Sequence, residues 1–409
     1  MIDAPRPRNP FRVLVTHANF RRFWIGQTLS LVGTWMQSMA IGWLALQLSD
    51  SAFVVGAVAA CSALPILLFS LYAGVMVDRS DKLRLVRIAQ LMLLLEGVAL
   101  WWFTWSGHIN IAGLIGLAVF GGVVTSVEIP ARQSLMIDLV GRDDLRDAIA
   151  LNSSGFNLAR IFGPAIGAAI IAAFGIAWCF AVNALSYLTV LIGLALIQLP
   201  RREIAETAES PWEGMRAGIA FVRGEPRLRG LVEVISVMSI LGTPTLALMP
   251  VMARDQLHLG AGGYGLLLSA VGIGGLIGAL ALAASSRRLP RGKVLIRSQI
   301  TCAVLVTLLS LVRVPGLAYV LLLGTGFVFI VNSALGNTIL QSIVPDEYRG
   351  RLMSIYSLIV VGLPQVIGAF AAGAVARVVG MPWTLAVSGL LMLAYSRWAF
   401  RRYPEISAL

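Results

Sequence analysis

Apolar stretches of about 20 residues follow one another along nearly the whole chain, and a helix of that length spans a ~30 Å hydrocarbon core. Of the 409 residues, 58% are hydrophobic and 13% are charged, whereas soluble domains average about 25% charged residues. A soluble fold cannot bury so much apolar surface. The short alternating segments of a membrane β-barrel are also absent. The sequence therefore predicts an all-α polytopic membrane protein.

The apolar stretches predict twelve transmembrane helices. Their approximate ranges are 23–48, 52–77, 85–106, 109–131, 151–174, 176–199, 230–253, 263–285, 294–312, 316–343, 353–376 and 380–400. Nearly all of the 32 lysines and arginines then fall at the two termini or in every second loop, and only Arg254, Arg313 and Arg377 lie in the opposite loops. Because basic residues accumulate on the cytoplasmic side, we expect both termini to be cytoplasmic. The net charge of +12 is then a topology signal, and a nucleic-acid partner is not expected.

The only long polar segment, near the middle of the chain, divides it into two similar halves. We predict an N-terminal six-helix bundle over 1–199, a cytoplasmic linker with an amphipathic helix over 200–229, and a C-terminal six-helix bundle over 230–409. A shift of 205 residues aligns Gly163 with Gly368 and Gly175 with Gly380. Such pseudo-symmetric bundles enclose a cavity near the bilayer midplane, so the layout favours a transporter.

A dense group of charges lies between the second and third predicted spans, in "GVMVDRSDKLR". We expect Gly74, Asp78, Arg79 and Lys82 to form a cytoplasmic gate, with the Asp78 carboxylate at a helix N-terminus, where the helix dipole favours an anion. An ordinary positive-inside loop is the alternative interpretation.

Span 5 contains "ARIFGPAIG", in which small residues recur every four positions. Ala159, Gly163 and Gly167 would let two helix backbones approach closely, and Pro164 removes one helical hydrogen bond and permits a bend. General small-residue packing would produce the same pattern.

These two motifs resemble signatures of the major facilitator superfamily: the loop 2–3 motif and the exporter motif of its drug/proton antiporters. "GTWMQ", "EIPARQS" and "ALNSSGFNLARIFGPAIG" resemble the branch that includes the enterobactin exporter and macrolide efflux proteins. The resemblance covers essentially the whole chain. It implies the twelve-helix fold, an export function and a location in the inner membrane of a bacterium. Two departures are Asp81, where many members have glycine, and the absence of an arginine between Asn110 and Ile129 in span 4.

Charged residues inside the spans cost about 2.5–3.5 kcal/mol each on insertion scales and need a reason. Glu128 and Arg132 are four residues apart on one helix face, and Arg160 is at similar depth in the next span. We expect the three to form a membrane charge cluster, either moving or permanently neutralised. Glu96 has no partner in its own helix, so burial favours its neutral acid. It is a candidate proton carrier, or else a protonated structural residue, because the resemblance places span 3 outside the cavity-lining helices.

By the same resemblance, the cavity is lined by spans 1, 4, 7 and 10. The candidate lining residues are Gln27, Trp35, Gln37, Ser236, Thr243, Asn332 and Asn337, which suit an amphipathic ligand. No zinc-ligand spacing or phosphate-binding glycine loop occurs, so we expect no metal and no cofactor.

The sequence thus predicts a monomeric secondary active transporter, a proton-coupled exporter of an amphipathic small molecule such as a siderophore, a macrolide or another secondary metabolite. Its partners are this substrate, protons and the lipid bilayer. An importer of the same fold is the alternative. A membrane-embedded enzyme is a more distant one, because the three histidines are scattered over the N-terminal segment and two loops.

Overall fold

The computed structural model describes residues 11–197, 211–285, 290–344, 352, 356, 358 and 362–408, and the described elements are all helical. The first half contains α1 (Arg12–Thr16), α2 (Ala18–Ser49), α3 (Ala52–Asp78), α4 (Lys82–Trp105), α5 (Ile111–Val140), α6 (Leu145–Phe174) and α7 (Ala177–Ala195). The second half contains α8 (Pro211–Gly224), α9 (Pro226–Ala247), α10 (Met249–Val251), the π-helix η1 (Met252–Gln256), α11 (Ala261–Ser285), α12 (Arg291–Leu311), α13 (Pro315–Ile343), the π-helix η3 (Pro364–Gly368), α15 (Ala369–Val379), α16 (Met381–Arg402) and the 3₁₀-helix η4 (Pro404–Ala408).

Nine of the described helices are long and apolar enough to cross a membrane. α4 and α16 cover two further predicted spans, and the described part of predicted span 353–376 begins at residue 362. The all-α polytopic prediction is confirmed. Some boundaries differ: α5 continues to Val140 rather than ending near 131, and predicted span 230–253 breaks at Leu248. That break follows Pro244, whose ring nitrogen cannot donate a helical hydrogen bond.

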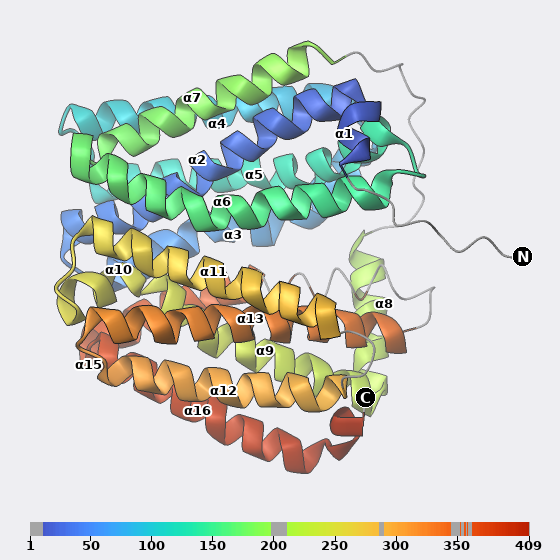
Figure 1. The fold of residues 1–409 in the computed structure, drawn as a ribbon, viewed down its shortest axis with the longest axis vertical. Helices are drawn as coiled ribbons and strands as arrows, with labels where there is room; N and C mark the ends of the chain where they lie inside the picture. The colour runs from blue at the N-terminus through green and yellow to red at the C-terminus, as the bar shows by residue number, and fades with distance from the viewer. Residues whose placement is uncertain are drawn as a thin grey trace, which may run out of the picture.

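The helices form two groups, one above the other in Figure 1. In the first half, α2 packs against α6 and α7, α3 against α5, and α4 against α5 and α7. In the second half, α11 packs against α13, and α12 packs against α13 and α16. α1, α8 and η4 lie at one end of the molecule, called here the terminal end, and α10 lies at the opposite, far end (Figure 1).

Equivalent glycines adopt equivalent geometry in the two halves. Gly175 ends α6 with φ 91° and donates to the Ile171 carbonyl at 3.0 Å. Gly380 ends α15 with φ 86° and donates to the Ala376 carbonyl at 2.9 Å. Positive φ strains residues that carry a Cβ, which explains glycine at both caps. The 205-residue shift therefore relates structural as well as sequence positions.

The buried apolar side chains show where the halves are joined. One cluster runs through both halves at the far end, and includes Trp43 and Phe180 from the first half and Tyr264 from the second. Toward the terminal end there are two separate clusters, one around Phe23 in the first half and one around Leu231 in the second. The described cores are therefore continuous at the far end and divided at the terminal end.

The predicted amphipathic helix corresponds to α8, in which the described side chain of Val222 is buried in the cluster of the second half. α8 contacts α9 and also α3 of the first half. It therefore touches both halves at the terminal end.

Candidate functional site

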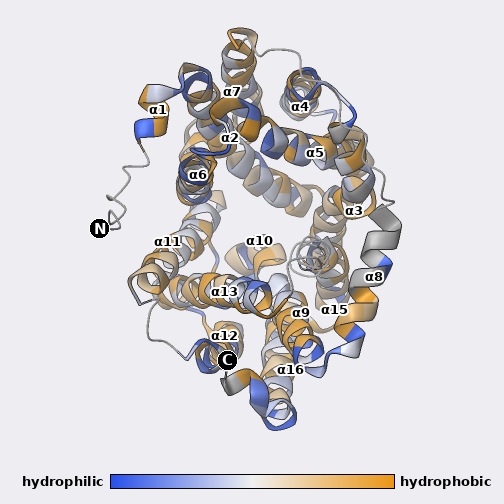
Figure 2. Ribbon diagram, turned by 90° about the vertical axis from the view of Figure 1, so that its right-hand side faces the viewer, coloured by the Kyte–Doolittle hydropathy of each residue, from blue (hydrophilic) through white to orange (hydrophobic). Residues whose placement is uncertain are grey.

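A cavity of about 470 Å³ lies between the two halves. Figure 2 looks from the terminal end and shows helices of both halves arranged around the space that contains it, with α10 beyond. The lining residues from the first half are Trp35, Ser38, Met39, Ile41, Gly42, Val55, Val58, Ala59, Ser62, Arg160 and Pro164. Those from the second half include Ile235, Met238, Ser239, Thr243, Tyr264, Leu268, Phe329, Asn332, Ser333 and Gln365. The walls are mostly apolar, with a few hydroxyl and amide groups, as in many ligand sites.

The cavity is closed at the far end by contacts between the halves. The Trp43 and Tyr264 rings stack with their centroids 5.9 Å apart, and the Ser269 hydroxyl donates to the Ile161 carbonyl at 2.8 Å. α3 and α15 pack through glycines, and a Cβ added to Gly373 would lie 3.1 Å from the Gly56 Cα. Such close approach requires small residues on both helices.

An ion pair also joins the halves at the far end. Arg254 donates to the Asp50 carboxylate at 2.6 Å and to its neighbour Asp255 at 2.6 Å. Asp50 lies in the α2–α3 turn with φ 53°, and its side chain is 84% exposed. The charged loop 2–3 motif predicts a gate at the opposite end, and no sequence pattern singled out this pair.

Of the seven predicted cavity residues, the structure places Trp35, Thr243 and Asn332 in the cavity lining. The other four occupy different positions. Gln37 is buried among α2, α4 and α7, and Gln27 is also buried. The hydroxyl of Ser236 donates to the backbone of its own helix, and the side-chain oxygen of Asn337 accepts from Gln341.

The small residues of the span 5 motif position α6 between two helices. A Cβ added to Gly163 would lie 2.8 Å from the Val32 carbonyl oxygen, and one added to Gly167 would lie 2.8 Å from Met36 Cγ, both on α2. Ala159 is fully buried. On α11, a Cβ at Gly265 would lie 2.5 Å from the Pro164 carbonyl oxygen. The motif therefore supports packing within the first half and across to the second.

Arg160 lies in the same stretch of α6, and its side chain lines the cavity. Its Nη2 donates to the Asn157 side-chain oxygen at 3.1 Å, and a Cβ added to Gly275 of α11 would collide with Nη2. Its Nε is buried and has no hydrogen-bond partner among the described residues. The guanidinium therefore reaches across the junction between the halves.

Glu128 and Arg132 form the predicted i, i+4 pair, with Arg132 Nε 2.8 Å from Glu128 Oε1. The same oxygen accepts a hydrogen bond from Gln90 of α4 at 3.2 Å. Arg160 instead donates to Asn157 and lies beside Gly275 of α11. Among the described residues, the predicted three-residue cluster is therefore a Glu128–Arg132 pair without Arg160. Glu128 is 5% exposed, and the pair lies within the first half.

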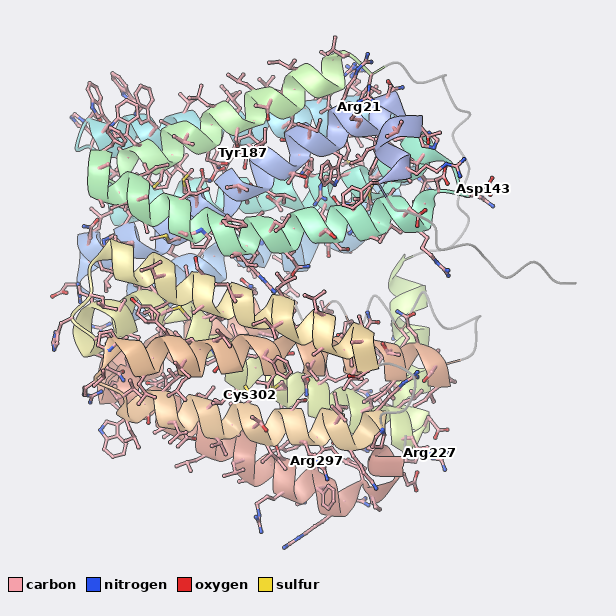
Figure 3. The ribbon with its side chains drawn as sticks, in the orientation of Figure 1. Arg21, Asp143, Tyr187, Arg227, Arg297 and Cys302 are labelled. Atoms are coloured by element: carbon pink, nitrogen blue, oxygen red, sulfur yellow. The ribbon has the colours of Figure 1, made fainter. Side chains whose placement is uncertain are left out.

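Glu96 belongs to a second buried polar group inside the first half. Gln37 donates to Glu96 Oε1 at 3.2 Å, and Asn183 of α7 donates to the Gln37 side-chain oxygen at 2.7 Å. Gly121 leaves room for the carboxyl group, since a Cβ there would lie 2.8 Å from Oε1. Tyr187, one helical turn from Asn183, is labelled within the first half in Figure 3. α2 separates the Glu96 group from the cavity: one face of α2 contacts Glu96 through Gln37, and the other face lines the cavity.

The predicted cytoplasmic gate motif lies at the terminal end of α3 and the start of α4. No atom lies within 4 Å of a Cβ added to Gly74, among the described residues. Lys82 pairs with Asp138 of α5 at 3.2 Å, while Arg79 is exposed. The Asp78 side chain lies outside the described part of the structure. The carboxylate that caps α4 belongs to Asp81, which accepts from the Arg84 backbone N–H at 3.0 Å.

The model of the transmembrane secretion effector family matches residues 9–407. The chain belongs to this family of the major facilitator superfamily. It is 30% identical over 372 residues to the multidrug efflux pump Tap of Mycolicibacterium fortuitum, covering 88% of this chain and 90% of Tap. It is 24% identical to the enterobactin exporter EntS of Shigella flexneri, over 84% of this chain and 82% of EntS.

A solved structure supports the same fold. A bacterial homologue of the human lysosomal transporter Spinster, in an inward-facing and unoccupied conformation, has a TM-score of 0.69 and covers 98% of this chain and 99% of that one, at 13% identity. The family member described here is therefore an integral membrane transporter of small molecules, and not an enzyme.

Proposed function

We propose that this transporter is a proton-coupled exporter that works by alternating access, with the central cavity as its substrate site. The observation that carries the proposal is the distribution of buried apolar clusters, one shared by both halves at the far end and two separate ones toward the terminal end. A cavity between such halves is closed at the far end, and rocking of the halves would open that end while it closes the terminal end.

We assign the terminal end to the cytoplasmic side of a bacterial inner membrane. Arg21 of the first half and Arg227 of the second both lie at this end (Figure 3), in line with the positive-inside rule. Cysteines introduced at Ser80 and His108 test the assignment. In intact cells, a membrane-impermeant thiol reagent should label the His108 variant and spare the Ser80 variant, and the reverse pattern would overturn the orientation.

The proposed substrate is an amphipathic small molecule. A cavity of about 470 Å³ lies within the range of about 300–1,000 Å³ typical of ligand pockets. The relatives include a multidrug pump and a siderophore exporter, which supports a drug, a siderophore or another secondary metabolite as the exported compound. Because the cavity lies wholly within one chain, we propose that a monomer is the functional unit.

Glu96 is the proposed proton carrier. Its carboxyl group is buried in the first half and bound by a neutral amide, and ionisable groups at such depth commonly mark proton pathways. Glu96→Gln keeps the size and hydrogen-bonding capacity but cannot titrate. We expect this variant to bind substrate and to lose the dependence of transport on the proton gradient, whereas an unchanged pH profile would assign Glu96 to structure.

The loop 2–3 motif is the proposed cytoplasmic gate. Among the described residues, no atom lies within 4 Å of a Cβ added to Gly74 in the present conformation. We propose that α3 approaches the second half here when the terminal end closes, with Asp78, Arg79 and Lys82 completing the gate. Asp78→Asn should slow transport without preventing insertion, and full activity would reduce the motif to a topology signal.

The decisive experiment for export uses inverted membrane vesicles. With an imposed gradient, acid inside, the vesicles should accumulate a fluorescent amphipathic substrate and release it when the gradient is dissipated. Uptake that persists without a gradient would remove the proton from the mechanism. Accumulation only when the gradient is reversed would favour an importer.

The two bundles, 1–199 and 230–409, joined by the linker 200–229, are the proposed rocking units.

A further inference from the structure

We infer that the central cavity selects organic anions with a large apolar body, and that Arg160 is the residue that recognises the anionic group. Among the described residues that line the cavity, Arg160 is the only one that carries a formal charge. The inference rests on the proposed function, since it names the chemical class of substrate for the same cavity.

No described acid neutralises this arginine. Glu128 is bound by Arg132 and Gln90, and Glu96 is bound by Gln37. Arg160 Nη2 donates to the neutral amide oxygen of Asn157. Because a charged group inside a membrane protein is retained where it pairs or serves a pathway, a bound anion is the counter-charge that this position lacks.

The guanidinium is held where a ligand can reach it. Gly275 of α11 leaves space for Nη2, and a Cβ added there would also lie 3.0 Å from Ile330 Cγ1. Nε is buried without a partner among the described residues. The Arg160 side chain lines the cavity, and a guanidinium presents parallel N–H donors that match a carboxylate, sulfonate or phosphate in two contacts.

The remaining walls define the rest of the ligand. Leu268, Phe329, Met238 and Ile235 supply apolar and aromatic surface from the second half, and Trp35 supplies it from the first. An anion without an apolar body would leave these walls in contact with water. A cationic amphiphile would place its charge beside Arg160, and the described lining residues include no carboxylate to pair with it. The geometry therefore favours amphipathic acids over neutral or cationic compounds of the same shape.

The test measures binding without transport. Purified protein in nanodiscs is titrated with three dansyl-labelled probes of one chain length: a fatty acid, its methyl ester and the corresponding fatty amine. Dansyl fluorescence is read against empty nanodiscs. We expect the acid to bind at least about tenfold more tightly than the amine, which corresponds to a difference of about 1.4 kcal/mol in binding free energy. Equal affinities for acid and amine would overturn the inference.

Three variants locate the effect. Arg160→Gln should weaken binding of the acid about tenfold or more and leave binding of the ester unchanged, which also reports that the variant is folded. Arg160→Lys should keep the preference for the acid. Gly275→Ala, which retains the charge but displaces the guanidinium, should weaken the acid selectively and guards against a misfolded glutamine variant. Arg397→Gln, an exposed position on α16, is the matched control.

The result separates this inference from the export proposal. If acids bind through Arg160 but no probe is moved across proteoliposome membranes, the export proposal fails and the anion site stands. If an amphipathic amine is exported and binds as well as the acid, export stands and the anion site is overturned.

Discussion

The glycines of α3 allow a direct test of rocking, because two of them, Gly56 and Gly74, lie near opposite ends of this helix. A Cβ added to Gly56 at the far end would overlap the Ala369 carbonyl oxygen and lie 3.0 Å from the Gly373 Cα. These are backbone atoms of the second half, which cannot move aside as a flexible side chain could. Gly56→Ala should therefore destabilise the conformation in which the far end is closed.

The magnitude follows from overpacking. Inserting a methyl group into a close backbone contact costs about 1–3 kcal/mol. The cost applies only while α3 and α15 are in contact, so the equilibrium moves about 5- to 150-fold toward the conformation that opens the far end. If that conformation is about 1% populated in the parent protein, the variant populates it at about 5–60%. The gain in helix propensity on replacing glycine by alanine, about 1 kcal/mol, is common to both conformations and cancels.

The assay is double electron–electron resonance on spin-labelled protein in nanodiscs, in a background without the native cysteines. One label pair, at His108 and Val314, spans the far end, and another, at Arg142 and Lys293, spans the terminal end. Gly56→Ala should lengthen the first distance and shorten the second. Unchanged distributions at both pairs would refute the reasoning.

Two further glycines serve as controls. Gly116 on α5 has no described atom within 4 Å of an added Cβ, so Gly116→Ala should leave both distance distributions as in the parent. Gly74 likewise has no described atom within 4 Å of an added Cβ, but it lies at the proposed cytoplasmic gate. Gly74→Ala should therefore favour the conformation described here, and a shift in the same direction as Gly56→Ala would contradict the gate.

Three predictions concern single polar contacts. Glu128→Ala leaves the nearly buried Arg132 without its counter-charge and should lower the free energy of unfolding by about 3–5 kcal/mol, measured by denaturation in detergent. A double variant that also removes the Arg132 charge should recover most of the loss. If it recovers none, the pairing is contradicted. Asp50→Asn breaks the exposed ion pair with Arg254 and should shift the far-end spin-label populations by at most about 1 kcal/mol, so a shift as large as that of Gly56→Ala would be inconsistent with a surface pair. Asp81→Ala removes the cap of α4 and should cost about 1 kcal/mol of stability, whereas Asp81→Asn, which can still accept from the backbone, should cost less, and equal losses would argue against capping.

The helical architecture was predictable because the lipid bilayer imposes the same length and apolar composition on every helix that crosses it. Span length depends on bilayer thickness and hydropathy, both of which a sequence reports directly. The internal repeat was predictable from the aligned glycines, and Gly175 and Gly380 proved to share one cap geometry. The boundary of α5 was not, because the helix continues as an amphipathic segment past the apolar run.

The facing of individual side chains could not be predicted in the same way. In a membrane bundle the lipid-facing and core-facing sides of a helix are both apolar, so periodicity does not distinguish them. Trp35 lines the cavity, while Gln37, two residues further along α2, binds Glu96 in the interior of the first half. Arg160 was expected beside Glu128 and Arg132, whereas its side chain donates to Asn157 of its own helix. Position along the chain does not specify rotation about the helix axis.

The position of Glu96 behind α2 has a consequence for energy coupling. Cargo in the cavity and a proton on Glu96 would be separated by the thickness of one helix, so neither can displace the other by occupying the same space. Exchange by direct competition is thereby ruled out for this carboxyl group. Under the proposed proton coupling, the two movements would be linked by a rotation or bend of α2. Substitutions that make α2 more flexible should then let protons cross without substrate, while both still bind.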